Sequence, residues 1–247
     1  MRDLAAYQDS YQALPFEDVQ ARFRKRKICE FLAKHRARRI LEVGCGLDPL
    51  FNHYLTFDRC TVIEPAERFF ENARAQAQGR TDVQVIRGTL EEKLPELAEG
   101  EYDFIVLSSL LHEIADPVPL LDAAATLCSP PTIVHVNVPN AYSVHRLLAV
   151  AMGVIGDVHA RSSVQVQMQQ SHTFDVAELR TLVQSRGFRV VEEGTFFIKP
   201  FTHAQMASLQ RSGFLTESML EGFYRLSPQF PDQGSEICMN MVLDGAR

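Results

Sequence analysis

Long hydrophobic runs are missing from this sequence of 247 residues. The longest apolar stretch, from Leu147 to Gly156, is about half of the roughly 20 residues that a membrane-spanning helix needs. The first residues, Met1-Arg2-Asp3, do not begin the charged and then apolar pattern of a secretion signal. We therefore expect a protein that neither spans a membrane nor is exported.

Cysteine is also scarce. The five cysteines lack the close spacings of a zinc site, a disulfide framework or an iron–sulfur cluster; they are Cys29, Cys45, Cys60, Cys128 and Cys238. This pattern predicts reduced thiols in a cytoplasmic protein, with no metal centre.

Positive charge is not in excess, because 25 Lys and Arg residues stand against 31 Asp and Glu residues, for a net charge of −6. No overall basic field exists to attract nucleic-acid phosphates, so a nucleic-acid partner is not expected. One basic run covers residues 22–27. Since Phe23 and Ile28 occupy inward positions there, the run is interpreted as the solvated face of a helix.

The sequence does contain a regular alternation of short β-branched runs with helical segments, which is typical of a parallel sheet. The clearest helix is Asp175–Gly187, with a capping box at Asp175 and Glu178. Asp48-Pro49 and Asp116-Pro117 also have the pattern of helix starts. The expected strands are Arg39–Val43, Cys60–Ile63, Val83–Arg87, Phe104–Ser108, Thr132–Val138, Arg189–Phe197 and Ile237–Leu243.

Three segments interrupt this alternation. We interpret residues 1–37 as an N-terminal helical cap, and residues 141–172 and 203–233 as lid insertions of a single domain, 1–247. In open α/β sheets the ligand binds beyond the carboxyl ends of the strands, where such segments cover it. The aromatic residue Tyr11 in the cap is a candidate to close over a cofactor.

A glycine turn follows the first strand, where Val43 leads into Gly44-Cys45-Gly46. Glycines permit a ligand to approach the backbone closely. The second strand ends at Glu64, where a carboxylate can accept hydrogen bonds from a ribose diol. Cys45 is interpreted as a small apolar residue. Together these features indicate a cofactor that contains a nucleoside.

The residue types after the turn favour one nucleoside cofactor over another. A dinucleotide fold has a third glycine, but Pro49 occupies that position, and Asp48 would repel a pyrophosphate. A cofactor with a sulfonium and an ammonium tolerates acids there, which favours S-adenosylmethionine over NAD. Radical chemistry with this cofactor needs a cysteine triad, which these spacings do not supply.

The sequence resembles the class I S-adenosylmethionine-dependent methyltransferases from about residue 38 to residue 243. The resemblance lies in ordered motifs: residues 40–46, Glu64, residues 87–91 and residues 102–114. It implies a doubly wound, Rossmann-like α/β fold with a mostly parallel seven-stranded sheet. It also implies a cofactor site made of Glu42, Gly44, Cys45, Gly46, Glu64, Pro65, Leu90, Glu91, Ser108 and Tyr11.

Within this superfamily the chain is most similar to bacterial methyltransferases of polysaccharide and natural-product pathways, through residues 138–146, His172 and residues 197–200. We expect methyl transfer to an oxygen or nitrogen of a polar small molecule. His112, which follows strand four, is the candidate base. His145, Arg146 and His172, at the two ends of an insertion, are candidates to bind the acceptor.

Other interpretations remain as alternatives: a peptide or protein acceptor, and a non-catalytic module that binds S-adenosylmethionine. A nucleic-acid acceptor is disfavoured by the acidic balance. The Asp/Asn-Pro-Pro-aromatic motif of exocyclic-amine enzymes is also missing after strand four, where Ser108-Ser109-Leu110-Leu111 stands. A monomer or a homodimer is expected.

Overall fold

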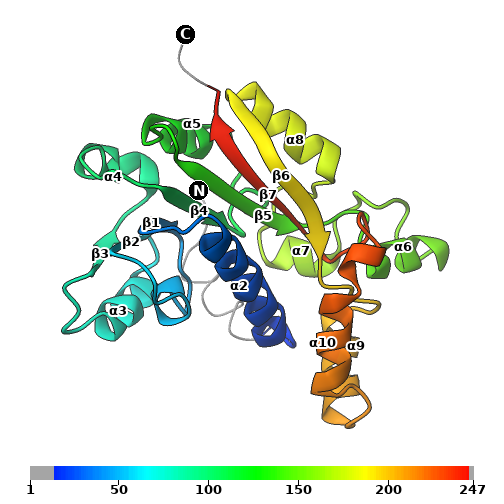
Figure 1. Ribbon diagram of the computed structural model, residues 1–247. Helices are drawn as coiled ribbons and strands as arrows, with labels where there is room; N and C mark the ends of the chain where they lie inside the picture. Colours follow the sequence, from blue (N-terminus) through cyan, green and yellow to red (C-terminus); the bar gives the residue numbers. More distant parts are fainter. Residues whose placement is uncertain (1–13, 245–247) are drawn as a thin grey trace.

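The computed structural model describes residues 14–244, except for the side chains of Ser163 and Gln167. Its centre is a seven-stranded sheet with the strand order β3-β2-β1-β4-β5-β7-β6 (Figure 1). Strands β1 to β5 are parallel, and β7 pairs antiparallel with both β5 and β6. The strands are β1 Arg39–Val43, β2 Arg59–Glu64, β3 Val83–Arg87, β4 Phe104–Ser108, β5 Ile133–Pro139, β6 Phe188–Phe196 and β7 Glu236–Leu243.

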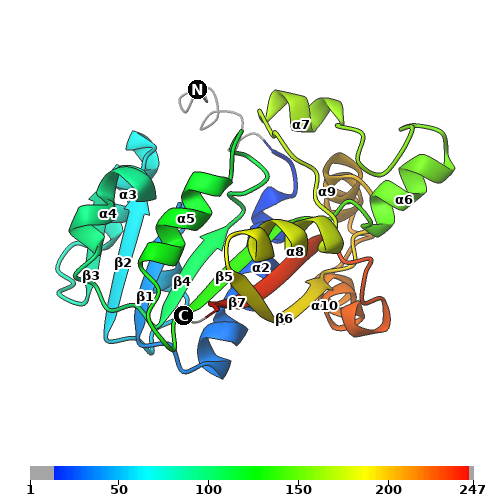
Figure 2. The same ribbon diagram turned by 90° about the horizontal axis from the view of Figure 1, so that it is seen from above.

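Helices cover both faces of this sheet (Figure 2). Their bounds are α2 Glu17–Lys34, η1 Leu50–Asn52, α3 Glu67–Gln76, α4 Leu90–Leu97, α5 Val118–Thr126, α6 Val144–Ala151, α7 Ser163–Gln167, α8 Val176–Ser185, α9 His203–Arg211, α10 Glu217–Arg225 and η2 Ser227–Gln229. The predicted Rossmann-like α/β fold is thereby confirmed. None of these helices is long and apolar enough to cross a membrane.

Two buried hydrophobic clusters lie between the sheet and its helices, one on each face. Helices α4, α5 and α8 pack on one face, where Leu121 and Leu179 contact the cluster that contains Leu107 of β4. Helices α2, η1 and α3 pack on the other face, around Leu32 and Phe51. Strand β4 at the centre of the sheet is buried on both faces, which explains why it is an almost continuous apolar run in the sequence.

A third cluster lies at the side of the molecule. Helices α9 and α10, from the insertion 203–233, pack against the first half of α2 through Phe23, Phe197 and Leu220. The Phe23 and Phe197 rings stack with their centroids 4.5 Å apart. This cluster holds the beginning of α2 at the end of β6.

The expected helix starts have mixed outcomes. The capping box at Asp175 and Glu178 is present. After the glycine turn, however, the expected helix is only the three-residue 3-10 helix η1, and its N-cap Pro49 has no side-chain cap. Asp48 does not cap it because its carboxylate pairs with Lys25 of α2 and lies 2.7 Å from His53 Nε2.

Candidate active site

The carboxyl ends of five parallel strands meet at one edge of the sheet. Ligands of open α/β sheets bind beyond this edge. Strands β1, β2 and β4 end there at Val43, Glu64 and Ser108. A recess of about 390 Å³ near Arg39, Arg59 and Tyr102 lies instead where the strands begin, so it is separate from the candidate site.

The glycine turn after β1 has the backbone that the sequence predicts. Gly44 and Gly46 have φ values of +71° and +59°, which disfavour other residues. A Cβ atom added to Gly44 would approach Leu110 Cδ2 to 2.8 Å, whereas nothing lies within 4 Å of one added to Gly46. The turn therefore packs tightly against the loop after β4 and leaves open space at Gly46.

Glu64 connects the end of β2 to this turn. Its Oε1 accepts a hydrogen bond from Ala66 N at 2.9 Å, and its Oε2 accepts one from Gly46 N at 3.2 Å. Cys45 Sγ lies 3.8 Å from the same Oε2, and the burial of both groups raises the pKa of each. Pro65 follows as a half-buried residue. A carboxylate held in this way fits the predicted contact with ribose hydroxyls.

Glu42 of β1 is buried behind the turn, where its Oε2 accepts a hydrogen bond from Leu50 N at 2.9 Å. Burial raises the pKa of Glu42 to about 7. Asp48 next to it is matched by the Lys25 ammonium. This ion pair compensates the negative charge of Asp48. Asp48 would therefore repel a pyrophosphate less strongly than the sequence suggested.

The remaining predicted cofactor residues lie along the same edge. Leu90 is buried and Glu91 exposed in the first turn of α4, directly after the Thr89 cap. Ser108 is half-buried and pairs in register with Asn137 of β5. Tyr11 lies outside the described residues. The assignment of this set to the cofactor stays a prediction.

The loop after β4 carries the candidate base. His112 is buried, at 3% exposure, with its Nε2 3.8 Å from Glu113 Oε1. Its carbonyl oxygen accepts hydrogen bonds from Ser171 N at 2.9 Å and His172 N at 3.1 Å. The end of the insertion 141–172 is therefore fastened to this loop through its backbone.

The three predicted acceptor residues have different surroundings. The Arg146 guanidinium donates to Val158 O at 2.9 Å, Ala160 O at 2.6 Å and Gln165 Oε1 at 2.9 Å, so it holds the insertion together. His172 Nε2 lies 3.0 Å from Ala115 O. By contrast, His145 Nδ1 is buried and has no hydrogen-bond partner among residues 14–244.

Sequence reasoning missed a group of buried and partly buried polar residues at the same edge, which we call the polar cluster: Gln20, Arg24, Asn137 and Glu236. Arg24 donates from Nε and Nη2 to the Glu236 carboxylate at 2.7–3.0 Å. Gln20 Nε2 and Asn137 Nδ2 donate to the same carboxylate at 2.8 and 2.7 Å. Burial would raise the pKa of Glu236, but these contacts outweigh it and lower the pKa.

The polar cluster reaches the end of β4, because Asn137 Nδ2 also lies 3.4 Å from Ser109 Oγ. Ser109 has a φ of +56°, a strained conformation that is common at functional sites. The amide oxygen of Gln20 is buried without a hydrogen-bond partner in the described part of the chain. The cluster therefore offers polar atoms next to the predicted position of the reacting methyl group.

The interpretation of residues 22–27 as a solvated face is wrong for two of them. The side chains of Arg24 and Lys25 are only 12% and 16% exposed, and both pair with acids at the candidate site. Arg22 and Arg26 are more exposed, as expected.

The sequence did contain one signal for the polar cluster. It was the presence of polar residues in strands that are otherwise apolar, namely Asn137 within β5 and Glu236 at the start of β7.

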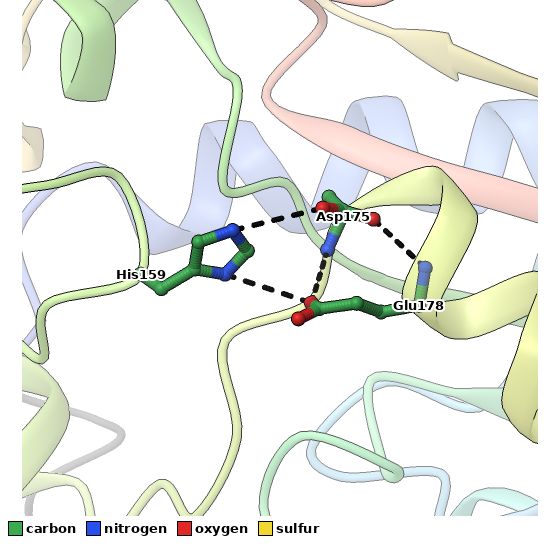
Figure 3. A group of neighbouring side chains, drawn as sticks. All are labelled: His159, Asp175 and Glu178. Carbon is green, nitrogen blue, oxygen red and sulfur yellow. Dashed lines mark hydrogen bonds and ion pairs between the residues drawn. The ribbon is translucent and has the colours of Figure 1, made fainter.

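One further group of side chains has the composition of a metal site: His159, Asp175 and Glu178 (Figure 3). The His159 ring nitrogens lie 3.6 Å from Asp175 Oδ2 and 3.5 Å from Glu178 Oε2. The two carboxylates already form the capping box of α8, and His159 Nδ1 also lies 3.2 Å from Thr173 O. The atoms that could bind a metal therefore already contact one another or the backbone. We interpret the group as a link between the insertion 141–172 and α8.

Solved structures with a similar fold are methyltransferases. The plantazolicin methyltransferase BamL, solved with a triazolic desmethylPZN analog and SAH, is 15% identical, with a TM-score of 0.57 and 98% of both chains covered. An S-adenosylmethionine-dependent methyltransferase from Mesorhizobium loti is 15% identical, with a TM-score of 0.54, covering 83% of this chain and 90% of that one. One from Archaeoglobus fulgidus is 15% identical, with a TM-score of 0.51 and coverages of 92% and 98%.

A glycine turn after β1, a carboxylate at the end of β2 and an antiparallel β7 between β5 and β6 define a class I S-adenosylmethionine-dependent methyltransferase. Residues 17–193 match the model of a family described as a methyltransferase domain, and the chain belongs to that family. S-adenosylmethionine is its methyl donor. A comparison with curated protein sequences finds no match.

Proposed function

We propose that this methyltransferase transfers its methyl group to an oxygen or nitrogen atom of a polar small molecule. The observation that carries the proposal is the polar cluster, which is buried and adjoins Ser109 at the end of β4. An unpartnered amide oxygen such as Gln20 Oε1 suits an O–H or N–H donor on the acceptor. BamL, which was solved with a triazolic analog beside SAH, supports an acceptor of this kind.

The donor site would be formed by the glycine turn and its neighbours. The open space at Gly46 permits close approach of a ligand, and Glu64, which is bonded to Gly46 N, would accept hydrogen bonds from ribose hydroxyls. Leu90 and Glu91 would contact the adenine, and Glu42, Cys45, Pro65 and Ser108 would complete the site. S-adenosylmethionine, when bound, supplies an electrophilic methyl group on a positively charged sulfur.

The protein mainly has to orient the acceptor and exclude water, because the methyl group is already activated. For a hydroxyl acceptor, His112 would take the hydroxyl proton as the acceptor oxygen is methylated. An amine acceptor that is already neutral needs no base before attack. The insertion 141–172 would cover this site, since it is fastened to the His112 carbonyl and to α8.

A transfer assay with labelled methyl donor tests the proposal. Purified protein is incubated with a cell extract that has been divided by filtration into small molecules and macromolecules. We expect label in a small-molecule product that chromatography separates from the unreacted donor, and no such product with protein inactivated by heat. Label only in protein or nucleic acid would show a macromolecular acceptor, and donor binding without transfer to any fraction would favour a non-catalytic module.

Two further properties belong to this proposal. All five cysteines are free thiols, which supports a location in the reducing cytoplasm. We also propose that the chain acts as a monomer or homodimer on a dissolved substrate, and light scattering of the purified protein would decide between these two states.

A further inference from the structure

Three basic side chains next to the polar cluster have no role in the proposed chemistry. They are His145 in the first turn of α6, Lys199 shortly after β6 and His203 at the start of α9, and we call them the basic trio. Figures 1 and 2 show α6 and α9 on the same side of the molecule, beyond the end of β6.

Backbone contacts bring these three segments together. Ser143 N donates to Asn140 O at 3.3 Å, and Asn140 N donates to Ser235 O at 3.0 Å. Ser235 N donates in turn to Phe197 O at 2.8 Å, two residues before Lys199. Phe16 completes the connection, since its ring centroid lies 6.4 Å from that of Phe197 and 6.2 Å from that of His203.

Several polar side-chain atoms of this region have no hydrogen-bond partner in the described part of the chain. Lys199 is 5% exposed, and its Nζ forms no hydrogen bond and no ion pair within 4 Å among residues 14–244. The carboxylates of Glu17 and Glu236 influence its charge, but both are bonded to Arg24. Within the same described residues, His145 Nδ1, His203 Nε2 and Ser143 Oγ also have no hydrogen-bond partner.

Such a group of unsatisfied atoms is unusual, because a buried polar group without a hydrogen-bond partner destabilises the folded protein. Lysine donates three hydrogen bonds, and a hydroxyl or a neutral imidazole can donate one. Burial, together with the charge of Lys199, lowers the pKa of His145 and His203, so both imidazoles are neutral near pH 7. One cation surrounded by neutral donors matches a group that is negatively charged and accepts several hydrogen bonds.

We propose that the basic trio, together with the Ser143 hydroxyl, binds a carboxylate or phosphate group of the methyl acceptor. This inference rests on the proposed function, and it narrows the acceptor to an anionic small molecule. The rest of that molecule would extend along the polar cluster toward Ser109. The sequence predicted His145 as a residue that binds the acceptor, but it did not predict Lys199 or His203.

Anion binding is measured on the full chain saturated with SAH, by calorimetric titration with inorganic phosphate and separately with succinate. We expect at least one of the two to bind the wild-type protein. Lys199→Met should weaken this binding about tenfold or more, as for loss of a charged hydrogen bond. Lys27→Met is the matched control, because Lys27 is a partly exposed lysine that pairs with Glu30, and it should bind like the wild type.

A second measurement is independent of affinity. The ε-methylene resonances of Lys199, assigned by comparison with Lys199→Met, report the pKa of its ammonium, which should rise when the anion binds. Equal binding by Lys199→Met, an unchanged Lys199 pKa or no binding of either anion would overturn the inference. The proposed function fails separately, if label enters only macromolecules or if transfer does not occur.

Discussion

Glu64 is the residue on which we expect donor binding to depend most, because its Oε2 accepts a hydrogen bond from Gly46 N in the glycine turn and its Oε1 accepts one from Ala66 N. Glu64→Gln replaces one acceptor oxygen by a donor and removes the negative charge, so the predicted contact with the ribose diol is weakened. We expect the Kd for SAH to rise about tenfold or more, as for a hydrogen bond to a charged group. Glu67→Gln is the control, since Glu67 is exposed nearby and pairs with Arg87. Calorimetry measures both, and equal SAH affinity in the two variants would remove Glu64 from the site.

His112 is expected to affect turnover and not donor binding. Its side chain is buried in the loop after β4, while its backbone carbonyl holds residues 171 and 172 whichever side chain is present. For a hydroxyl acceptor, His112→Asn should lower kcat by about 100-fold or more, as for loss of a general base. The Kd for SAH should stay within about twofold, because the glycine turn is unchanged. Normal turnover with a hydroxyl acceptor would contradict the assignment.

Glu42 should make stability depend on pH. Because burial raises its pKa to about 7, the folded protein keeps the carboxyl neutral while the unfolded chain ionises near the ordinary value. Its contribution is therefore most favourable below about pH 4 and declines as the pH rises to about 7. The loss is on the order of 3 kcal/mol.

The test compares the wild type with Glu42→Gln, which keeps an acceptor for Leu50 N but cannot ionise. Urea unfolding at several pH values between 5 and 8 should show a smaller decline for the variant. Parallel pH curves would mean that Glu42 does not titrate in this range.

At the scale of elements, the junction between α2 and β7 depends on one buried ion pair. The side chains of Arg24 and Glu236 are 12% and 2% exposed, and two further side chains donate to Glu236. Removing one member of a buried pair leaves the other charge uncompensated, which typically costs about 3–5 kcal/mol. We expect Arg24→Met to lose stability of this order in urea unfolding. Arg22→Met, at an exposed pair with Glu217, should change it by less than about 1 kcal/mol.

Other elements show how much of the fold the sequence predicts. The bounds of β1, β3 and β4 agree with the prediction. Strands β1 and β4 are mostly buried and apolar, whereas β3 at the edge of the sheet has no buried residue and mixes apolar with polar residues. The capping box of α8 was readable because its two members are three residues apart. The helix expected after the glycine turn was wrong, since Asp48 binds Lys25 of a distant helix.

The polar cluster lay beyond sequence reasoning for a related reason. Arg24 and Glu236 are 212 positions apart, and only the folded sheet brings them together. Within a single sequence, Arg24 is indistinguishable from its solvated neighbours in the basic run. The candidate donor site could be predicted because each of its residues lies at or near the end of a strand that the sequence shows, whereas the proposed acceptor side is assembled from α2, β5, β7 and the two insertions.

At the scale of the whole molecule, donor binding should protect one edge of the sheet. The predicted contacts all lie where β1 to β4 end, in residues 44–48, 64–66, 88–91 and 108–113. Hydrogen exchange with and without SAH should therefore slow in these segments and stay unchanged around Arg39, Arg59 and Tyr102 at the opposite edge. At about 100 times its Kd, SAH should also raise the free energy of unfolding by about 2.7 kcal/mol. NAD should do neither, and protection at the opposite edge would place the donor elsewhere on the sheet.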